Sequence, residues 1–179
     1  MERPLKRTND FTPLGALALG VGAGVIGTAC MTAWQEVNAK LRRRHAMAAG
    51  GRAANADPWE HAPAPAKLAR RVVEGVFERE VPVERIPLFT NAVHWGYGTM
   101  MGPAYALVQA SRRGNPIVRG SLFGLSVWTM SYATLVPLGL YDPPWRYKPT
   151  TVAKDISYHL VYGGGVAAGF ELLAKAFRR

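Results

Sequence analysis

The chain contains one cysteine, Cys30, among its 179 residues. A single cysteine excludes an internal disulfide and any metal centre built from several thiolates. The sequence also lacks an H-E-x-x-H helix, a phosphate-binding loop, a Ser-His-Asp order and a G-x-G-x-x-G placed between a strand and a helix. We therefore expect no catalytic residues and no metal site, and hydrolase or kinase chemistry has no support.

Charged residues are missing from four long windows, although they make up 19% of the chain. The windows cover residues 11–35, 86–111, 120–141 and 156–170. A helix needs about 20 mainly apolar residues to cross a bilayer, and the first three windows meet that length. The fourth window does so only if Glu171 lies at the interface. The sequence thus predicts four transmembrane helices, at about 13–37, 87–111, 117–140 and 153–176.

Small residues four apart form ridges along three of these spans. Such ridges allow helix backbones to approach each other closely in lipid. In the first span the ridge consists of Ala16, Gly20, Gly24, Thr28 and Thr32. In the second and fourth spans it includes Gly98, Gly102, Gly163 and Ala167. We expect these residues to be helix-packing positions.

The pattern H-x-x-Y-G occurs twice, at His94-Tyr97-Gly98 and at His159-Tyr162-Gly163. The two copies lie in the second and fourth predicted spans, which run in the same direction through the membrane. We expect the repeat to place these spans side by side or across a pseudo-twofold axis along the membrane normal, as parallel repeats do in some transporters.

The two histidines permit several interpretations, since polar groups inside a membrane are costly and are a functional hypothesis by default. Hydrogen bonding between helices or anchoring near the interface is the plainest one. The pair could also ligate one haem, or form a proton or ligand path with Tyr97, Tyr162 and Asp155. Two histidines are too few for a closed zinc site.

Residues 66–80, in the long first loop, read as an amphipathic helix. Apolar residues fall on one face of it, and charged residues lie on the other sides. A helix of this kind suits the membrane interface. Packing against the ends of the spans is a compatible alternative. The apolar residues are Leu68, Val72, Val73, Val76 and Phe77.

The net charge of +10 comes from Lys and Arg scattered over tails and loops. Without a nucleic-acid-binding signature, anionic lipid headgroups are the expected partners, since each basic residue near the surface gains about 1 kcal/mol there. The termini and the turn between the second and third spans carry nine of these residues, which favours both termini inside the cell. The long first loop carries ten, with Arg42–Arg44 close to the membrane, and favours the reverse orientation; we expect the termini inside. Other membrane proteins, or a second copy of the chain, are further expected partners.

The second half of the chain resembles the small bacterial inner-membrane proteins of the YagU type. The resemblance rests on the end of the third span at Pro137–Leu140, on the loop residues Pro143, Pro144 and Trp145, and on the His-Leu-Val of His159–Val161. It covers about a third of the chain, and the first loop differs because it lacks cysteines. The resemblance implies a small polytopic inner-membrane protein whose termini lie inside, and it implies no catalytic residues.

The sequence as a whole predicts an all-α protein with a single membrane domain, residues 1–179. We expect a four-helix membrane bundle in the bacterial inner membrane that serves as a scaffold, an accessory subunit or a transporter-like protein, without catalytic activity. The alternative is a haem-binding or redox protein that uses His94 and His159.

Overall fold

The computed structural model describes residues 11–48, 57–110 and 115–177. Within these residues the chain is helical and contains no strand, which confirms the all-α prediction. Five α-helices and two short 3-10 helices make up the fold. They are α1 (Pro13–Ala48), α2 (Ala64–Phe77), η1 (Val83–Arg85), α3 (Ile86–Ala110), α4 (Pro116–Leu135), η2 (Pro144–Arg146) and α5 (Pro149–Phe177).

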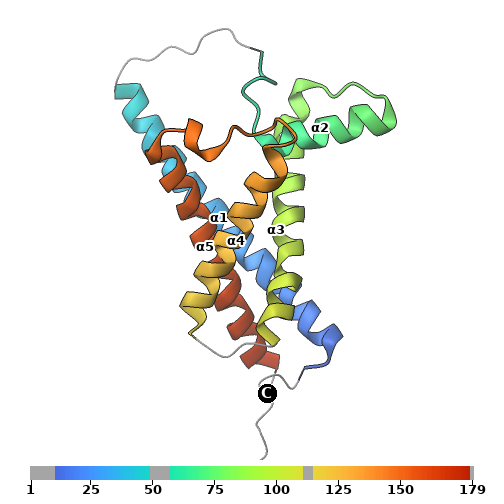
Figure 1. Ribbon diagram of the computed structural model, residues 1–179, viewed down its shortest axis with the longest axis vertical. Coiled ribbons are helices and arrows are strands. Elements are labelled where there is room, and N and C mark those ends of the chain that lie inside the picture. The colour runs from blue at the N-terminus through green and yellow to red at the C-terminus, as the bar shows by residue number, and fades with distance from the viewer. Residues whose placement is uncertain (1–10, 49–56, 111–114, 178–179) are drawn as a thin grey trace, which may run out of the picture.

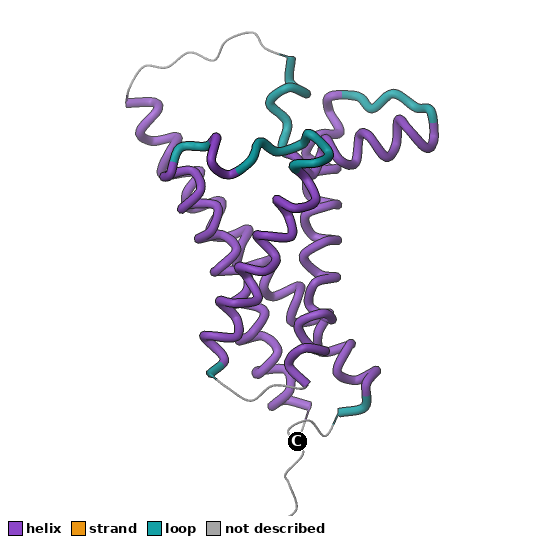
Figure 2. Tube along the Cα trace, viewed as in Figure 1, coloured by secondary structure: helices purple, strands orange, loops and turns teal. Residues whose placement is uncertain are grey.

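Four long helices form an elongated bundle, and α2 extends sideways from one end of it (Figure 1). Helices α1 and α4 run toward the end that carries α2, whereas α3 and α5 run away from it. We call the end with α2 and residues 136–148 the loop end, and the opposite end the terminal end. Loops are confined to these two ends (Figure 2), which leaves helix alone along the shaft of the bundle.

Two helices are long and apolar enough to cross a membrane, α1 over Pro13–Arg44 and α5 over Pro149–Phe177. Helices α3 and α4, with 25 and 20 residues, have comparable length. Neither contains a segment of membrane-spanning length as apolar as those of α1 and α5, and polar side chains such as Asn91 and His94 in α3 and Arg119 in α4 interrupt them. Length and composition therefore support membrane crossing for two of the four predicted spans.

Several helix ends differ from the sequence prediction. Helix α1 continues through the basic run of residues 40–44 to Ala48, because no proline interrupts it. Helix α4 ends at Leu135 rather than near residue 140, since Pro137 follows and Gly139 adopts a positive φ of 63°. The predicted helix 66–80 spans Ala64–Phe77 and ends where Glu78 turns left-handed at φ 51°.

Helices α1 and α3 cross with their backbones in contact. A Cβ atom added to Gly20 would lie 2.7 Å from the Cα of Pro103 and 2.9 Å from the Cβ of Ala106. One added to Gly102 would meet the carbonyl oxygen of Gly20, and would lie 2.8 Å from the Cα of Gly24. Only glycine leaves room for this approach, the small-xxx-small packing typical of helices in lipid.

Helices α4 and α5 cross in the same way. A Cβ atom on Gly120 would lie 2.8 Å from the carbonyl oxygen of Gly163 and 3.0 Å from the Cβ of Ala167. One on Gly163 would meet the carbonyl oxygen of Gly120 and lie 2.8 Å from the Cα of Gly124. The contacts of the α4–α5 crossing thus match those of the α1–α3 crossing one by one.

The two crossings define a structural repeat, α1 with α3 and α4 with α5. Its register differs from that of the H-x-x-Y-G repeat, which pairs Gly98 with Gly163. The structure instead pairs Gly102 with Gly163, a shift of about one helical turn. The equivalent pairs are Gly20 and Gly120, Gly24 and Gly124, Gly102 and Gly163, and Ala106 and Ala167.

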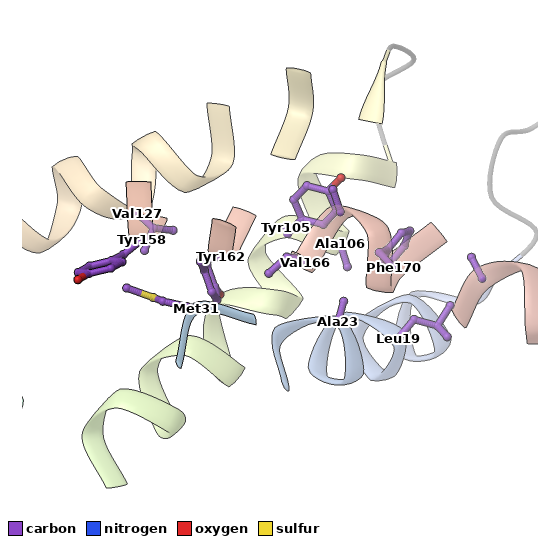
Figure 3. Close-up of a cluster of buried hydrophobic side chains, with 12 residues drawn as sticks. Leu19, Ala23, Met31, Tyr105, Ala106, Val127, Tyr158, Tyr162, Val166 and Phe170 are labelled. Atoms are coloured by element: carbon purple, nitrogen blue, oxygen red, sulfur yellow. The ribbon is translucent and has the colours of Figure 1, made fainter. Parts of the chain in front are cut away.

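The two halves join mainly through α1 and α5. A Cβ atom on Gly27 of α1 would lie 2.9 Å from the carbonyl oxygen of Tyr162, and one on Gly165 of α5 would lie 3.0 Å from the Cα of Gly27. Tyr105, Tyr162 and Phe170 are nearly fully buried between the helices (Figure 3). The core is therefore built from close backbone contacts and from a few aromatic rings.

Helix α2 is attached to the start of α3 by a second apolar cluster. Its buried members are Trp59, Ala62, Ala66 and Val81, and Val73, Ile86 and Phe89 pack against them. Glu74 accepts hydrogen bonds from Arg70 Nε at 2.8 Å and from the backbone N–H of Val81 at 3.3 Å. The Arg70 guanidinium lowers the pKa of the Glu74 carboxyl, so the pair is ionised at neutral pH.

Candidate functional site

The polar residues singled out in the sequence lie in the half of the bundle nearer the loop end. His94 lies on α3, about two turns from its start, and His159 lies on α5. Asp155 is one turn before His159, toward the loop end. We call His94, Asp155 and His159, with the side chains bonded to them, the polar cluster.

His94 is bonded to α1 rather than to the other histidine. Its Nε2 lies 3.2 Å from the hydroxyl of Thr32, and that hydroxyl lies 2.9 Å from the carbonyl oxygen of Thr28. A hydroxyl has one proton. Because Thr32 donates that proton to the carbonyl, the Nε2–H of His94 is the donor to Thr32. The histidine thus joins α3 to α1.

His159 is held within its own helix. Its Nδ1 lies 3.0 Å from the carbonyl oxygen of Asp155 and 3.8 Å from the Oδ1 atom of the same residue. Each histidine ring therefore has a hydrogen-bond partner of its own. This arrangement competes with the expectation that the two rings share one partner or ligand.

Asp155 connects α5 to α4 through two residues that the sequence analysis did not identify. Trp128 Nε1 donates to its Oδ2 at 3.0 Å, and the Tyr132 side chain interacts electrostatically with the carboxylate. Trp128 and Tyr132 lie one turn apart on α4. This four-residue spacing, facing a carboxylate on the next helix, is the signal that could have suggested them.

Aromatic rings cover Asp155 at the loop end. The Tyr132 ring lies 5.0 Å from Trp128, 5.2 Å from Tyr141 and 6.4 Å from Tyr147, measured between centroids. Burial, and then the Asp155 carboxylate, raises the pKa of Tyr141 to about 12, so this phenol is neutral at physiological pH. The 136–148 loop thereby places the neutral phenol of Tyr141 near the carboxylate, which stays about a quarter exposed.

The two tyrosines of the H-x-x-Y-G repeat have different surroundings. Tyr162 is almost fully buried, and its hydroxyl donates to the carbonyl oxygen of Gly98 at 2.7 Å. Tyr97 is 39% exposed, and its side chain lies near Ser131 of α4. Of the two tyrosines, Tyr162 therefore links two helices by a hydrogen bond, from α5 to α3.

The structural repeat shows which polar residues occupy equivalent positions in the two halves of the bundle. In its register, His94 corresponds to Asp155 and Thr32 corresponds to Tyr132. The pair Thr32–His94 joins α1 to α3, and the pair Tyr132–Asp155 joins α4 to α5 at the equivalent place. Each half of the bundle therefore has one polar pair on the loop-end side of its glycine crossing, and we call each pair a clasp. Because His94 corresponds to Asp155, the two histidines are not equivalent.

We expect Asp155→Ala to destabilise the protein, because it leaves Trp128 Nε1 without its acceptor. An unsatisfied buried donor costs about 1–3 kcal/mol. Asp155→Asn keeps a carbonyl acceptor and should cost less. The matched control is Asp142→Ala, at an exposed carboxylate paired with Arg146, which should change stability by no more than about 0.5 kcal/mol. Unfolding in mixed detergent micelles measures all three, and equal losses for the two alanine variants would show that the clasp does not hold α4 to α5.

In the described part of the chain, no three His, Cys, Asp or Glu residues are grouped so as to hold a metal ion. Two cavities, of about 560 and 540 Å³, lie away from the histidines. The first is lined by α2 and residues 78–81, and the second by Lys67 and residues 136–147. Neither provides a ligand chamber at the polar cluster.

No protein-family model, curated protein or solved structure matches this chain.

Proposed function

We propose that the protein is a four-span integral membrane protein that acts as a scaffold, an accessory subunit or a transporter-like bundle, without catalytic activity of its own. The observation that carries the proposal is the pair of equivalent glycine crossings. Contact between backbones needs no water-driven burial of large side chains, and is the packing by which helices associate in lipid.

The crossings support our proposal that four helices, and not only the two most apolar ones, cross the membrane. Helix α3 is fixed against α1 and α4 against α5 along the same shaft. At 1.5 Å per residue, 20–25 residues give a length of about 30–37 Å, enough for the apolar core of a bilayer. Their outer faces expose large apolar side chains, which water would disfavour. These are Met100, Leu107, Val108, Ile117, Leu122 and Met130.

The polar cluster supports a structural role better than a catalytic one, since its members bond to neighbouring helices. The two-half architecture is the feature that favours the transporter-like variant, because parallel repeats related by an axis along the membrane normal occur in transporters. In that variant, the Thr32–His94 and Tyr132–Asp155 clasps are the groups that a small solute or proton would meet.

Haem binding remains the second candidate, since α3 and α5 bring two histidines into one half of the bundle. His159 could ligate iron through Nε2 while its Nδ1 stays bonded to a carbonyl oxygen, a common arrangement for metal ligands. His94 would have to break its bond to Thr32. An absorption spectrum of protein purified from haem-replete cells decides this. We expect no haem band, and a band lost in both His94→Ala and His159→Ala would establish the alternative.

We further propose placement in a bacterial inner membrane with termini inside, which the nine basic residues of the two termini and of the segment between the second and third predicted spans support. Anionic lipids on that face are the expected partners. Kinship with the YagU-type proteins is part of the proposal, and rests on the turn at Pro137–Leu140, on the loop through Trp145 and on His159–Val161.

Two measurements test the proposed class. The protein should stay in the membrane pellet after carbonate washing and need detergent for release, whereas a soluble protein would end the proposal. Crosslinking in intact membranes before purification then separates the variants. A stoichiometric heterologous partner supports the accessory subunit, and purification alone or as a homo-oligomer supports the transporter-like bundle.

A further inference from the structure

Helix α2 has two apolar stripes, of which only one is used in packing. Ala66 and Val73, seven residues apart, face the cluster at the start of α3. Val72 and Val76 lie roughly a quarter to a third of a turn away at 100° per residue. Both are at least half exposed, as is Phe77 at the end of the helix. The second stripe is therefore a separate surface that nothing in the described chain covers.

The position of this stripe relative to the bundle is fixed. At its first half, α2 is held by the cluster of Trp59, Ala66 and Val81. Farther along, Arg71 Nη1 donates a hydrogen bond to the carbonyl oxygen of Leu138 in the 136–148 loop. With these two attachments, α2 projects sideways from the shaft at the loop end (Figure 1), where a bilayer surface would meet a four-span bundle.

Electrostatic attraction does not account for a contact between α2 and the bilayer surface. Residues 60–85 contain five basic and five acidic side chains, and Arg70 is paired with Glu74. Val83 and Leu88, the latter in the first turn of α3, are further large apolar side chains that are exposed at this end of the bundle. An apolar stripe with no excess charge fits the interface between headgroups and acyl chains.

We propose that α2 is a docking arm for the bilayer surface, which inserts Val72 and Val76 into the leaflet at the loop end by apolar burial rather than by attraction to anionic headgroups. The inference rests on the membrane placement proposed above. The proposed lipid contact lies outside the spans, and apolar burial is the force that holds it. A peripheral helix of this type binds in proportion to its buried apolar area.

The test uses the full-length protein with Cys30→Ser and one introduced cysteine carrying an environment-sensitive fluorophore. Val76→Cys reports the stripe. Glu78→Cys, two residues on and exposed in the left-handed turn just after the helix, is the matched control. Leu122→Cys, on the exposed face of α4, reports the membrane placement itself. Each variant is reconstituted in vesicles of phosphatidylcholine, with and without phosphatidylglycerol, and brominated lipid serves as quencher.

We expect the Val76 probe to emit at shorter wavelength and to be quenched several-fold more strongly than the Glu78 probe, to the same extent in both lipid mixtures. Equal quenching of Val76 and Glu78 would overturn the docking arm. Quenching of Val76 only with phosphatidylglycerol would overturn the apolar force. A shielded Val76 probe that brominated lipid does not quench would place a protein surface there instead. Failure of the Leu122 probe to be quenched would refute the membrane placement, separately from the arm.

Discussion

Gly163→Ala should destabilise the protein by about 1–3 kcal/mol, the usual cost of forcing an extra methyl group into a packed core. The added Cβ would meet the carbonyl oxygen of Gly120 and lie 2.6 Å from the nitrogen of Gly124. All of these are backbone atoms of α4, so no side chain can rotate away. The strain has to be relieved by separating α4 from α5.

The neighbouring residue provides the control. Gly164 is exposed, and a Cβ added there meets nothing within 4 Å. Alanine at this position should leave stability unchanged or raise it by up to about 1 kcal/mol, because alanine is the better helix former. Unfolding by titration with sodium dodecyl sulfate in mixed micelles compares the two variants. A Gly163→Ala protein as stable as Gly164→Ala would mean that the close approach of α4 and α5 does not exist.

Gly102→Ala and Gly98→Ala, one turn apart on α3, should behave differently although both glycines face α1. A Cβ on Gly102 meets the backbone of Gly20 and Gly24, whereas one on Gly98 meets the side chain of Thr28. The clash at Gly98 is thus with atoms that a second substitution removes. We expect Thr28→Ala to recover much of the stability lost in Gly98→Ala and none of that lost in Gly102→Ala.

A double-mutant cycle measures this coupling, since residues in contact show non-additive changes of about 0.5–3 kcal/mol. Thr28→Ala alone has a cost, because its hydroxyl donates to the carbonyl oxygen of Gly24 at 2.8 Å, and the cycle subtracts that cost. Additive losses in Thr28→Ala/Gly98→Ala would contradict the packing of α3 on α1. Rescue of Gly102→Ala by Thr28→Ala would contradict the register of the structural repeat.

The sequence predicted the helices well, since the absence of charge over long windows and the recurrence of small residues are local signals. It did not predict their ends, because Glu78 and Gly139 stop helices through backbone conformations that depend on the surrounding contacts. Helix α1 shows the reverse case, since it continues past the predicted end of the span near residue 37, through the basic run of residues 40–44, to Ala48.

The candidate site was harder to predict. The letters H-x-x-Y-G suggested that His94 and His159 are equivalent, but the pairing of helices depends on where two backbones have room to touch. By that criterion, Gly102 corresponds to Gly163 and His94 to Asp155. The partners Thr32, Trp128 and Tyr132 lie on other helices, and a sequence pattern within one helix contains no information about its neighbours.

The measurement that tests the account most directly concerns α4, whose membrane crossing rests on packing rather than on hydropathy. Single cysteines in a Cys30→Ser background are placed at Ile117 and Trp145, both strongly exposed at opposite ends of the bundle, and at Phe177 near the C-terminal end of α5. A membrane-impermeant maleimide is then applied to sealed vesicles of each orientation. The four-span bundle predicts that positions 117 and 177 are labelled from one side and position 145 from the other. Labelling of 117 and 145 from the same side would show that α4 does not cross the membrane.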